Sequence, residues 1–276
     1  MIKPILQNES FLDDVRNTTP DQLHLWWLGQ SGYLIRWQGH HLLLDPYLSD
    51  SLTKKYANTN KPHVRMTERV IAPEQLNFVD VVTSSHNHTD HLDGETLIPL
   101  SQANPTLRVI VPRANINFAA ERLQVAPEQL TPIRVDDAPL EIDPFSFEAI
   151  PSAHESIEQD EHNDHRFIGL VIKIDKWTIY HSGDCVPYDG LAERLKKWKI
   201  DLALLPINGR DQSRGVAGNF NATEAVALAK EIGAGLVIPC HYEMFEFNTV
   251  STEGFIHTAK EMNQPYRVLR CGERLR

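Results

Sequence analysis

The sequence predicts a layered fold in which β-strands and α-helices are mixed, of the α/β or α+β class. Short apolar, β-branched runs recur along the chain, and helical periods fall between them. No internal repeat, low-complexity segment or linker divides the 276 residues. We therefore expect a single domain over residues 1–276.

The first part of the chain predicts three short strands followed by a long excursion. Strands are expected over residues 23–28, 33–37 and 41–44, because turns containing glycine separate these apolar runs. From Pro46 to Leu76 the composition is polar without a clear period, which indicates a path over the surface. Long loops of this kind are often functional, so the excursion is a candidate lid or subunit contact in a homo-oligomer.

The rest of the chain alternates strand-like and helical segments. Strands are expected in the stretches FVDVVTSS, RVIVP, PIRV, FSFEAIP, FIGLVIKI, WTIYHSG, DLALLP and LVIPCH. Helices are expected over residues 94–102, 114–123, 191–198, 223–232 and 252–262. The helix near residue 223 has Asn221 or Thr223 as its expected N-cap.

Composition and charge exclude several classes of protein. A net charge of −10 argues against binding to nucleic acid, whose backbone requires clustered Lys and Arg. No signal peptide and no run of roughly 20 apolar residues is present, so we expect a cytoplasmic protein without a membrane span. Cys185, Cys240 and Cys271 are too scattered for a disulfide framework, which fits free thiols in a reducing compartment.

The stretch SSHNHTDHLDG contains the most informative motif. His86 and His88 are two residues apart, so in an extended segment they point to the same side and can bind one ion. Asp90 and His91 follow at an expected turn and can reach a second ion. Imidazole and carboxylate are ligands of zinc and related cations, whereas a turn has no need of three imidazoles.

Three further strands run directly into a residue that can bind metal. They end at His154, Asp184 and His241. Each of these positions alone is weak evidence, because a histidine after a strand is more often a satisfied core or surface residue. Together with the strand before His86, they predict a metal site at one edge of a sheet.

These residues, in this order, resemble the metallo-β-lactamase superfamily. The H-x-H-x-D-H motif is highly specific, and the resemblance spans most of the chain. It implies a four-layer αβ/βα sandwich, an α+β fold, with a site for two metal ions between the sheets. Carried over to this sequence, one metal would be held by His86, His88 and His154, and the second by Asp90, His91 and His241. Asp184 would bridge both ions, with Asp45 and His181 as residues behind the ligands.

Within that superfamily the sequence is similar to the L-ascorbate-6-phosphate lactonase family. The matching stretches are WWLGQSG, YHSGD, Arg214-Gly215 and IPCH, whereas the segment around Ile207–Arg210 departs from the lactonase pattern. The resemblance implies a small anionic substrate. Arg210 and Arg214 are the expected substrate-binding residues, with Arg166, His162 and His165 as further candidates.

The implied chemistry is metal-dependent hydrolysis. Two divalent cations, zinc or manganese with iron as an alternative, about 3.5–4 Å apart would generate a hydroxide nucleophile, and Asp90 would orient it and pass a proton to the leaving oxygen. No GxSxG motif is present, so a covalent acyl-enzyme is less favoured. Opening of a phosphorylated sugar-acid lactone is the leading hypothesis. A phosphodiesterase and a non-catalytic metal-binding scaffold are the alternatives.

Overall fold

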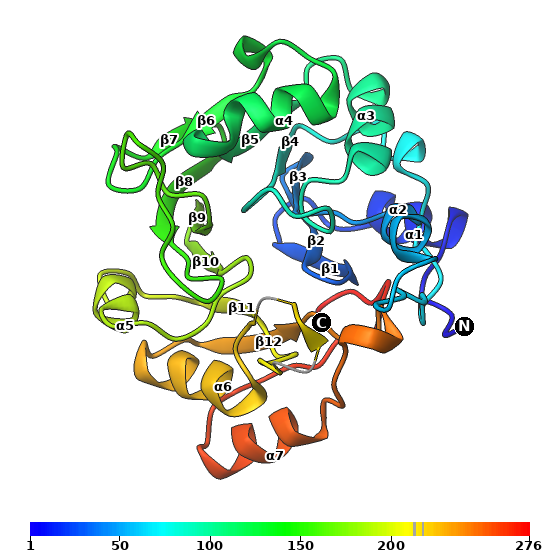
Figure 1. Cartoon of the computed structure of the whole chain (residues 1–276). Coiled ribbons are helices and arrows are strands. Elements are labelled where there is room, and N and C mark those ends of the chain that lie inside the picture. The colour runs from blue at the N-terminus through cyan, green and yellow to red at the C-terminus, as the bar shows by residue number, and fades with distance from the viewer. Residues whose placement is uncertain (212–213, 217) are drawn as a thin grey trace.

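The computed structural model describes residues 1–211, 214–216 and 218–276 and contains two six-stranded sheets that face each other (Figure 1). In the first sheet β1 to β3 are antiparallel and β3 to β6 are parallel. Its strands, in spatial order, are β1 (His24–Gly29), β2 (Gly32–Trp37), β3 (His40–Leu44), β4 (Val81–Thr83), β5 (Arg108–Pro112) and β6 (Thr131–Ile133).

The second sheet repeats this arrangement, since its antiparallel part again comes before its parallel part along the chain. Strands β7 to β10 are antiparallel, and β10 to β12 are parallel. The strands, in chain order, are β7 (Leu140–Ile142), β8 (Phe145–Pro151), β9 (Ile168–Ile174), β10 (Trp177–His181), β11 (Leu202–Pro206) and β12 (Leu236–Cys240).

Helices cover the outer faces of both sheets, with α3 and α4 outside the first and α5, α6 and α7 outside the second (Figure 1). The helices are α1 (Glu9–Arg16), α2 (Ser51–Tyr56), α3 (Gly94–Ala103), α4 (Ile116–Leu123), α5 (Leu191–Leu195), α6 (Ala222–Glu231) and α7 (Glu253–Glu261). Helix α6 begins at Asn221, whose side chain accepts a 2.9 Å hydrogen bond from the Glu224 amide, so Asn221 is the cap. The predicted four-layer α+β sandwich is confirmed.

The core between and beside the sheets is apolar. Trp26, Trp27, Tyr33, Phe147 and Tyr180 are among its largest fully buried side chains. Burial of such rings removes large apolar areas from water and is the main stabilising contribution. All three cysteines are buried and free. Across the residues that the structure describes, no helix has the length and apolar character needed to cross a bilayer.

The C-terminal segment covers one edge strand of each sheet. The amide of Val237 in β12 donates to the carbonyl of Pro265, and the Leu275 amide donates to Leu25 in β1 at 2.8 Å. The Gly272 amide likewise donates to the carbonyl of Trp27. Residues 265–275 therefore satisfy backbone groups that two open edges would otherwise expose.

The excursion from Pro46 to Leu76 differs in part from the expectation. It contains α2, and several of its apolar side chains are buried rather than exposed. Tyr47 and Leu52 pack with Met244 and Phe245 in a small cluster separate from the main core. The segment is thus anchored in the fold and forms a wall of the cavity described below.

Candidate metal centre

The parallel strands of both sheets deliver polar residues to the same edge of the sandwich. In the first sheet Asp45 follows β3, and His86 lies close after β4. In the second sheet His154, Asp184 and His241 follow β8, β10 and β12. Because these strands run in a common direction within each sheet, their carboxyl ends meet at one place.

Close approach of the two sheets at this edge depends on glycine. Gly183, just before Asp184, has φ +57°, a conformation that favours glycine. A Cβ atom at Gly183 would lie 2.6 Å from the Cβ atom of Ser85. Any larger residue would force the two strand ends apart.

The seven expected ligands lie in two compact groups. Within each group, one ligand atom per residue lies within 4.8 Å of the others. The first group is His86, His88 and His154, and the second is Asp90, His91, Asp184 and His241. Asp184 also links the groups, since one carboxylate oxygen lies 3.2 Å from His91 Nε2 and the other lies 3.7 Å from His154 Nε2.

The buried polar atoms of these groups fit a cation. His86 Nε2, His91 Nε2 and Asp184 Oδ1 are buried and form no hydrogen bond with the described residues. Unpaired buried polar atoms are costly, and each needs an explanation. Divalent cations bound by these donor atoms would satisfy them, and the nitrogen and oxygen donor set is typical of zinc and related metals.

Hydrogen bonds behind the ligands fix which ring nitrogen faces the site. His91 Nδ1 donates to Asp45 Oδ2 at 2.7 Å, and His154 Nδ1 donates to the Gly218 carbonyl at 2.8 Å. Both rings therefore present Nε2 to the cluster. Asp45 has no exposed surface and also accepts hydrogen bonds from Thr83 and Ser85. This is the pattern by which carboxylates orient metal-binding histidines.

The electrostatics differ between the two groups. Burial and the charges of neighbouring imidazoles lower the pKa of His86 well below its usual value, so its ring is neutral and can bind a cation through a nitrogen lone pair. Burial would raise the pKa of Asp184, but His91 and His241 hold it well below its usual range. Against the effect of burial, the carboxylates raise the pKa of His241 to about 9. Binding of a cation to the second group would therefore release protons.

Gln30 is a further residue of the site that the sequence did not identify. It lies in the turn between β1 and β2 with φ +49° and is 1% exposed. Its side-chain amide donates to Asp90 Oδ2 at 2.7 Å and lies 2.9 Å from His241 Nε2. The available signal was its place in WWLGQSG, where an apolar strand runs into a polar turn as at the other strand ends.

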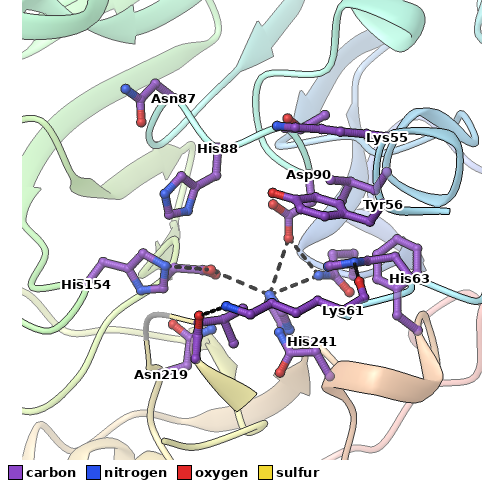
Figure 2. A pocket seen from close by; sticks show the side chains of 18 of the residues that line it. Lys55, Tyr56, Lys61, His63, Asn87, His88, Asp90, His154, Asn219 and His241 are labelled. Carbon is purple, nitrogen blue, oxygen red and sulfur yellow. Dashed lines mark hydrogen bonds and ion pairs between the residues drawn. The ribbon is translucent and has the colours of Figure 1, made fainter. Parts of the chain in front are cut away.

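A cavity of about 520 Å³ opens above the two groups (Figure 2). His88, Asp90, His154, Asp184 and His241 lie in its wall. Its other walls come from α2 and the following loop, from α4, and from Gly215, Val216, Asn219, Phe245 and Asn248. The side chains nearest the solvent include Lys55, Tyr56, Lys61, Phe118 and Arg122.

The structure places the expected substrate arginines beside this cavity rather than in its wall. Arg210 and Arg214 line a neighbouring cavity. Arg210 pairs with Glu224, and Arg214 donates to the side chain of Asn248 at 2.7 Å. Asn248 itself lines the cavity above the His/Asp groups, so Arg214 contacts that wall from behind.

Three further expected residues, Arg166, His162 and His165, lie outside the site. Arg166 and His162 line a separate surface cavity, and His165 contacts Gln159 at 3.4 Å. His181 is buried, and its Nε2 atom donates to the Ser31 carbonyl at 3.1 Å. Among the described contacts, none joins His181 to the seven ligand residues by a hydrogen bond.

Comparisons with known proteins identify the family of the chain. Residues 40–242 match the family described as the beta-lactamase superfamily domain. The chain is 24% identical over 254 residues to a UPF0173 metal-dependent hydrolase of Saccharolobus solfataricus, with 90% of this chain and 97% of the relative covered.

Two solved structures share the fold. Igni18, a metallo hydrolase from Ignicoccus hospitalis, superposes with a TM-score of 0.66 at 18% identity and covers 92% of this chain and 97% of its own. An isothiocyanate hydrolase from Delia radicum gut bacteria gives a TM-score of 0.68 at 18% identity, with 92% and 98% covered. The family match includes all seven expected ligands and ends just after His241. The chain therefore belongs to the beta-lactamase superfamily.

Proposed function

We propose that the protein is a metal-dependent hydrolase that opens a lactone of a phosphorylated sugar acid, such as L-ascorbate 6-phosphate. The observation that carries the proposal is the presence of two adjacent groups of potential metal ligands. Within each group the ligand atoms lie within 4.8 Å of one another, and five of the seven residues line one cavity. When bound there, two divalent cations would supply Lewis acidity and lower the pKa of a coordinated water. Zinc, manganese and iron all suit the His/Asp donor set.

The roles of the protein side chains follow from their positions. His86, His88 and His154 would hold one cation, Asp90, His91 and His241 the other, and Asp184 both. Asp90 faces the cavity and is held by Gln30, so it is suited to accept a hydrogen bond from the attacking water and then carry its proton to the leaving oxygen. The attractions of His91 and His241 outweigh the effect of burial and keep the pKa of Asp90 well below its usual range, so the carboxylate is an anion that can accept.

The lactone assignment rests on the resemblance of the sequence and on the size of the cavity. A cavity of about 520 Å³ accommodates a sugar-sized molecule. Hydrolysis of a lactone yields a carboxylate, whereas hydrolysis of a phosphodiester by the same centre would yield a phosphomonoester. The identity of the product therefore separates the two reactions.

The test is turnover of L-ascorbate 6-phosphate and of bis(p-nitrophenyl) phosphate by manganese- or zinc-loaded protein. We expect ring opening of the lactone. We also expect Asp184→Asn to lose the bound metal and at least about 100-fold in kcat/KM, because it replaces the carboxylate shared by both groups with a neutral amide, which binds metal more weakly. Turnover of only the diester would reassign the protein as a phosphodiesterase. Metal binding without turnover of either compound would favour a non-catalytic scaffold, and full activity of the variant would refute the dimetal centre.

A further inference from the structure

We propose that Lys55 and Lys61 form the specificity site of the cavity and bind the phosphate group of the substrate. The inference rests on the proposed hydrolase function and adds the residues that select the substrate. It assigns a role to the segment between β3 and β4, whose sequence shows no clear period.

The positive side chains that line the cavity favour an anionic ligand. Outside the seven His/Asp ligands, the described lining contains Lys55, Lys61 and Arg122 but no carboxylate. The whole chain carries a net charge of −10, so this local excess of positive charge runs against the composition. Positive side chains around a concave site raise the local concentration of anionic ligands.

Within the part of the chain that the structure describes, the two lysines also differ from their neighbour Lys54 in having no acidic partner. Lys54, one residue before Lys55, pairs with Glu95 at 2.7 Å. Among the described residues, no carboxylate lies within ion-pair distance of Lys55 or Lys61. Lys55 instead lies near the ring of Tyr56, with its ammonium 5.2 Å from the ring centre.

Lys61 lies across the cavity in front of His241 (Figure 2). Its ammonium donates to the carbonyl of Gly215, which is on the opposite wall. A neutral carbonyl is a weaker partner for an ammonium than a charged oxygen. An anion in the cavity would therefore be a better hydrogen-bond acceptor for Lys61. To bind it, Lys61 would give up a neutral carbonyl and would not have to break an ion pair with a carboxylate.

Arg122 is the third cation, but its Nη1 atom already binds two backbone carbonyls. It donates to the carbonyls of Asn87 and Leu92 at 2.6 and 3.1 Å, in the loop that carries the ligands. By comparison, Lys61 donates to one carbonyl and Lys55 to none among the described residues, so the lysines are the cations more available to a ligand. A phosphomonoester has enough charged oxygens to accept hydrogen bonds from both of them, and lysine is a common phosphate ligand.

The experiment compares Lys55→Gln and Lys61→Gln with Lys54→Gln as the matched control, all in the zinc-loaded protein. Lys54 neighbours Lys55 on α2 but does not line the cavity. Calorimetry measures the affinity for D-ribose 5-phosphate and for D-ribose, and kinetics measure kcat/KM for L-ascorbate 6-phosphate and for L-ascorbate. The ribose pair contains no lactone, so binding can be judged even if the ring-opening assay fails.

We expect the unmodified protein to prefer each phosphorylated compound. Lys55→Gln and Lys61→Gln should each weaken that preference about tenfold, as expected for loss of one hydrogen bond to a charged group. Lys54→Gln should remain within about twofold of the unmodified protein, because surface ion pairs contribute little. If the affinities for D-ribose 5-phosphate and D-ribose follow this pattern but no protein opens the lactone, the lysine site would be supported and only the proposed reaction would be rejected.

Three results would overturn the inference. The first is equal binding of ribose and ribose 5-phosphate by the unmodified protein. The second is an undiminished phosphate preference in both cavity variants, which would place the phosphate on another group. The third is an equal loss in all three variants, which would indicate a general effect of net charge.

Discussion

Asp45 does not line the cavity, yet it controls the orientation and protonation of the expected metal ligand His91. Its carboxylate is fully buried and accepts hydrogen bonds from His91, Ser85 and Thr83. Burial alone would raise the pKa of this carboxyl, but these hydrogen bonds and the charges of His91 and His181 lower it. Asp45 therefore remains an anion that can hold the Nδ1 proton of His91 and leave Nε2 free.

We predict that Asp45→Asn weakens metal binding about 10–100-fold, the usual cost of losing a carboxylate behind a metal-binding histidine. Competition with a chromophoric chelator measures the affinity. Asp175→Asn is the control, because Asp175 is exposed in the turn between β9 and β10. Unchanged affinity in Asp45→Asn would show that the hydrogen bond to His91 has no role in orienting the ligand.

The residues that sequence could identify are those with local signals. His86, His88, Asp90 and His91 form one motif, and the remaining ligands end apolar strands. The lysines of the cavity had no such signal, because only the folded path of residues 51–63 brings them over a site formed by distant strands. Arg214 was expected in the cavity from its motif, but its hydrogen bond to Asn248 shows contact with the wall from behind.

At the scale of elements, α4 stabilises the loop between β4 and α3 that carries four of the ligands. Arg122, near the end of α4, donates to carbonyls close to both ends of that loop. Its guanidinium also stacks over the ring of Phe118, 4.4 Å from the ring centre. The helix thus holds the loop in its shape before any ligand binds.

We predict that Arg122→Met lowers the free energy of unfolding by about 1.5–3 kcal/mol, the range for hydrogen bonds to a charged group, and also weakens metal binding. Urea denaturation and chelator competition measure the two effects. Glu121→Gln, at an exposed position of the same helix, should change neither. A loss of stability at unchanged metal affinity would mean that Arg122 supports the helix but not the loop.

Elements with a strong apolar period were predictable, and short ones were not. Apart from β7, the strands from β4 onward were predicted, because their β-branched runs end abruptly in polar turns. Helix α1 was missed, since only Phe11, Leu12 and Val15 of its eight residues are buried. Helix α2 and strand β7 were also missed, because six and three residues are too few to establish a period.

At the scale of the whole molecule, stability should depend on pH through a buried histidine far from the ligands in sequence. His41 in β3 packs against Phe78 with ring centres 4.6 Å apart. Burial and the charge of Arg36 lower its pKa from 6.5 to about 4. The folded protein therefore keeps this ring neutral at pH values where the unfolded chain protonates it.

We predict that the free energy of unfolding decreases progressively as the pH is lowered from about 6.5 to about 4. The difference between the two pKa values corresponds to at most about 3 kcal/mol for this group. Urea denaturation at pH 7.5 and 5 should show a smaller difference for His41→Leu than for the unmodified protein. His257→Gln, which changes an exposed histidine of α7, should retain the full difference, and an equal response in all three proteins would exclude His41 as its source.

The covering of β1 by residues 272–275 has a consequence for the synthesis of the protein. Leu25 is translated long before Leu275, and at about 5–20 residues per second the interval is roughly 12–50 s. Throughout it, the β1 edge of the nascent chain has backbone donors and acceptors without their final partners. Exposed strand edges can pair with other chains, so the growing polypeptide passes through a period in which it depends on molecular chaperones or on dilution to remain unaggregated.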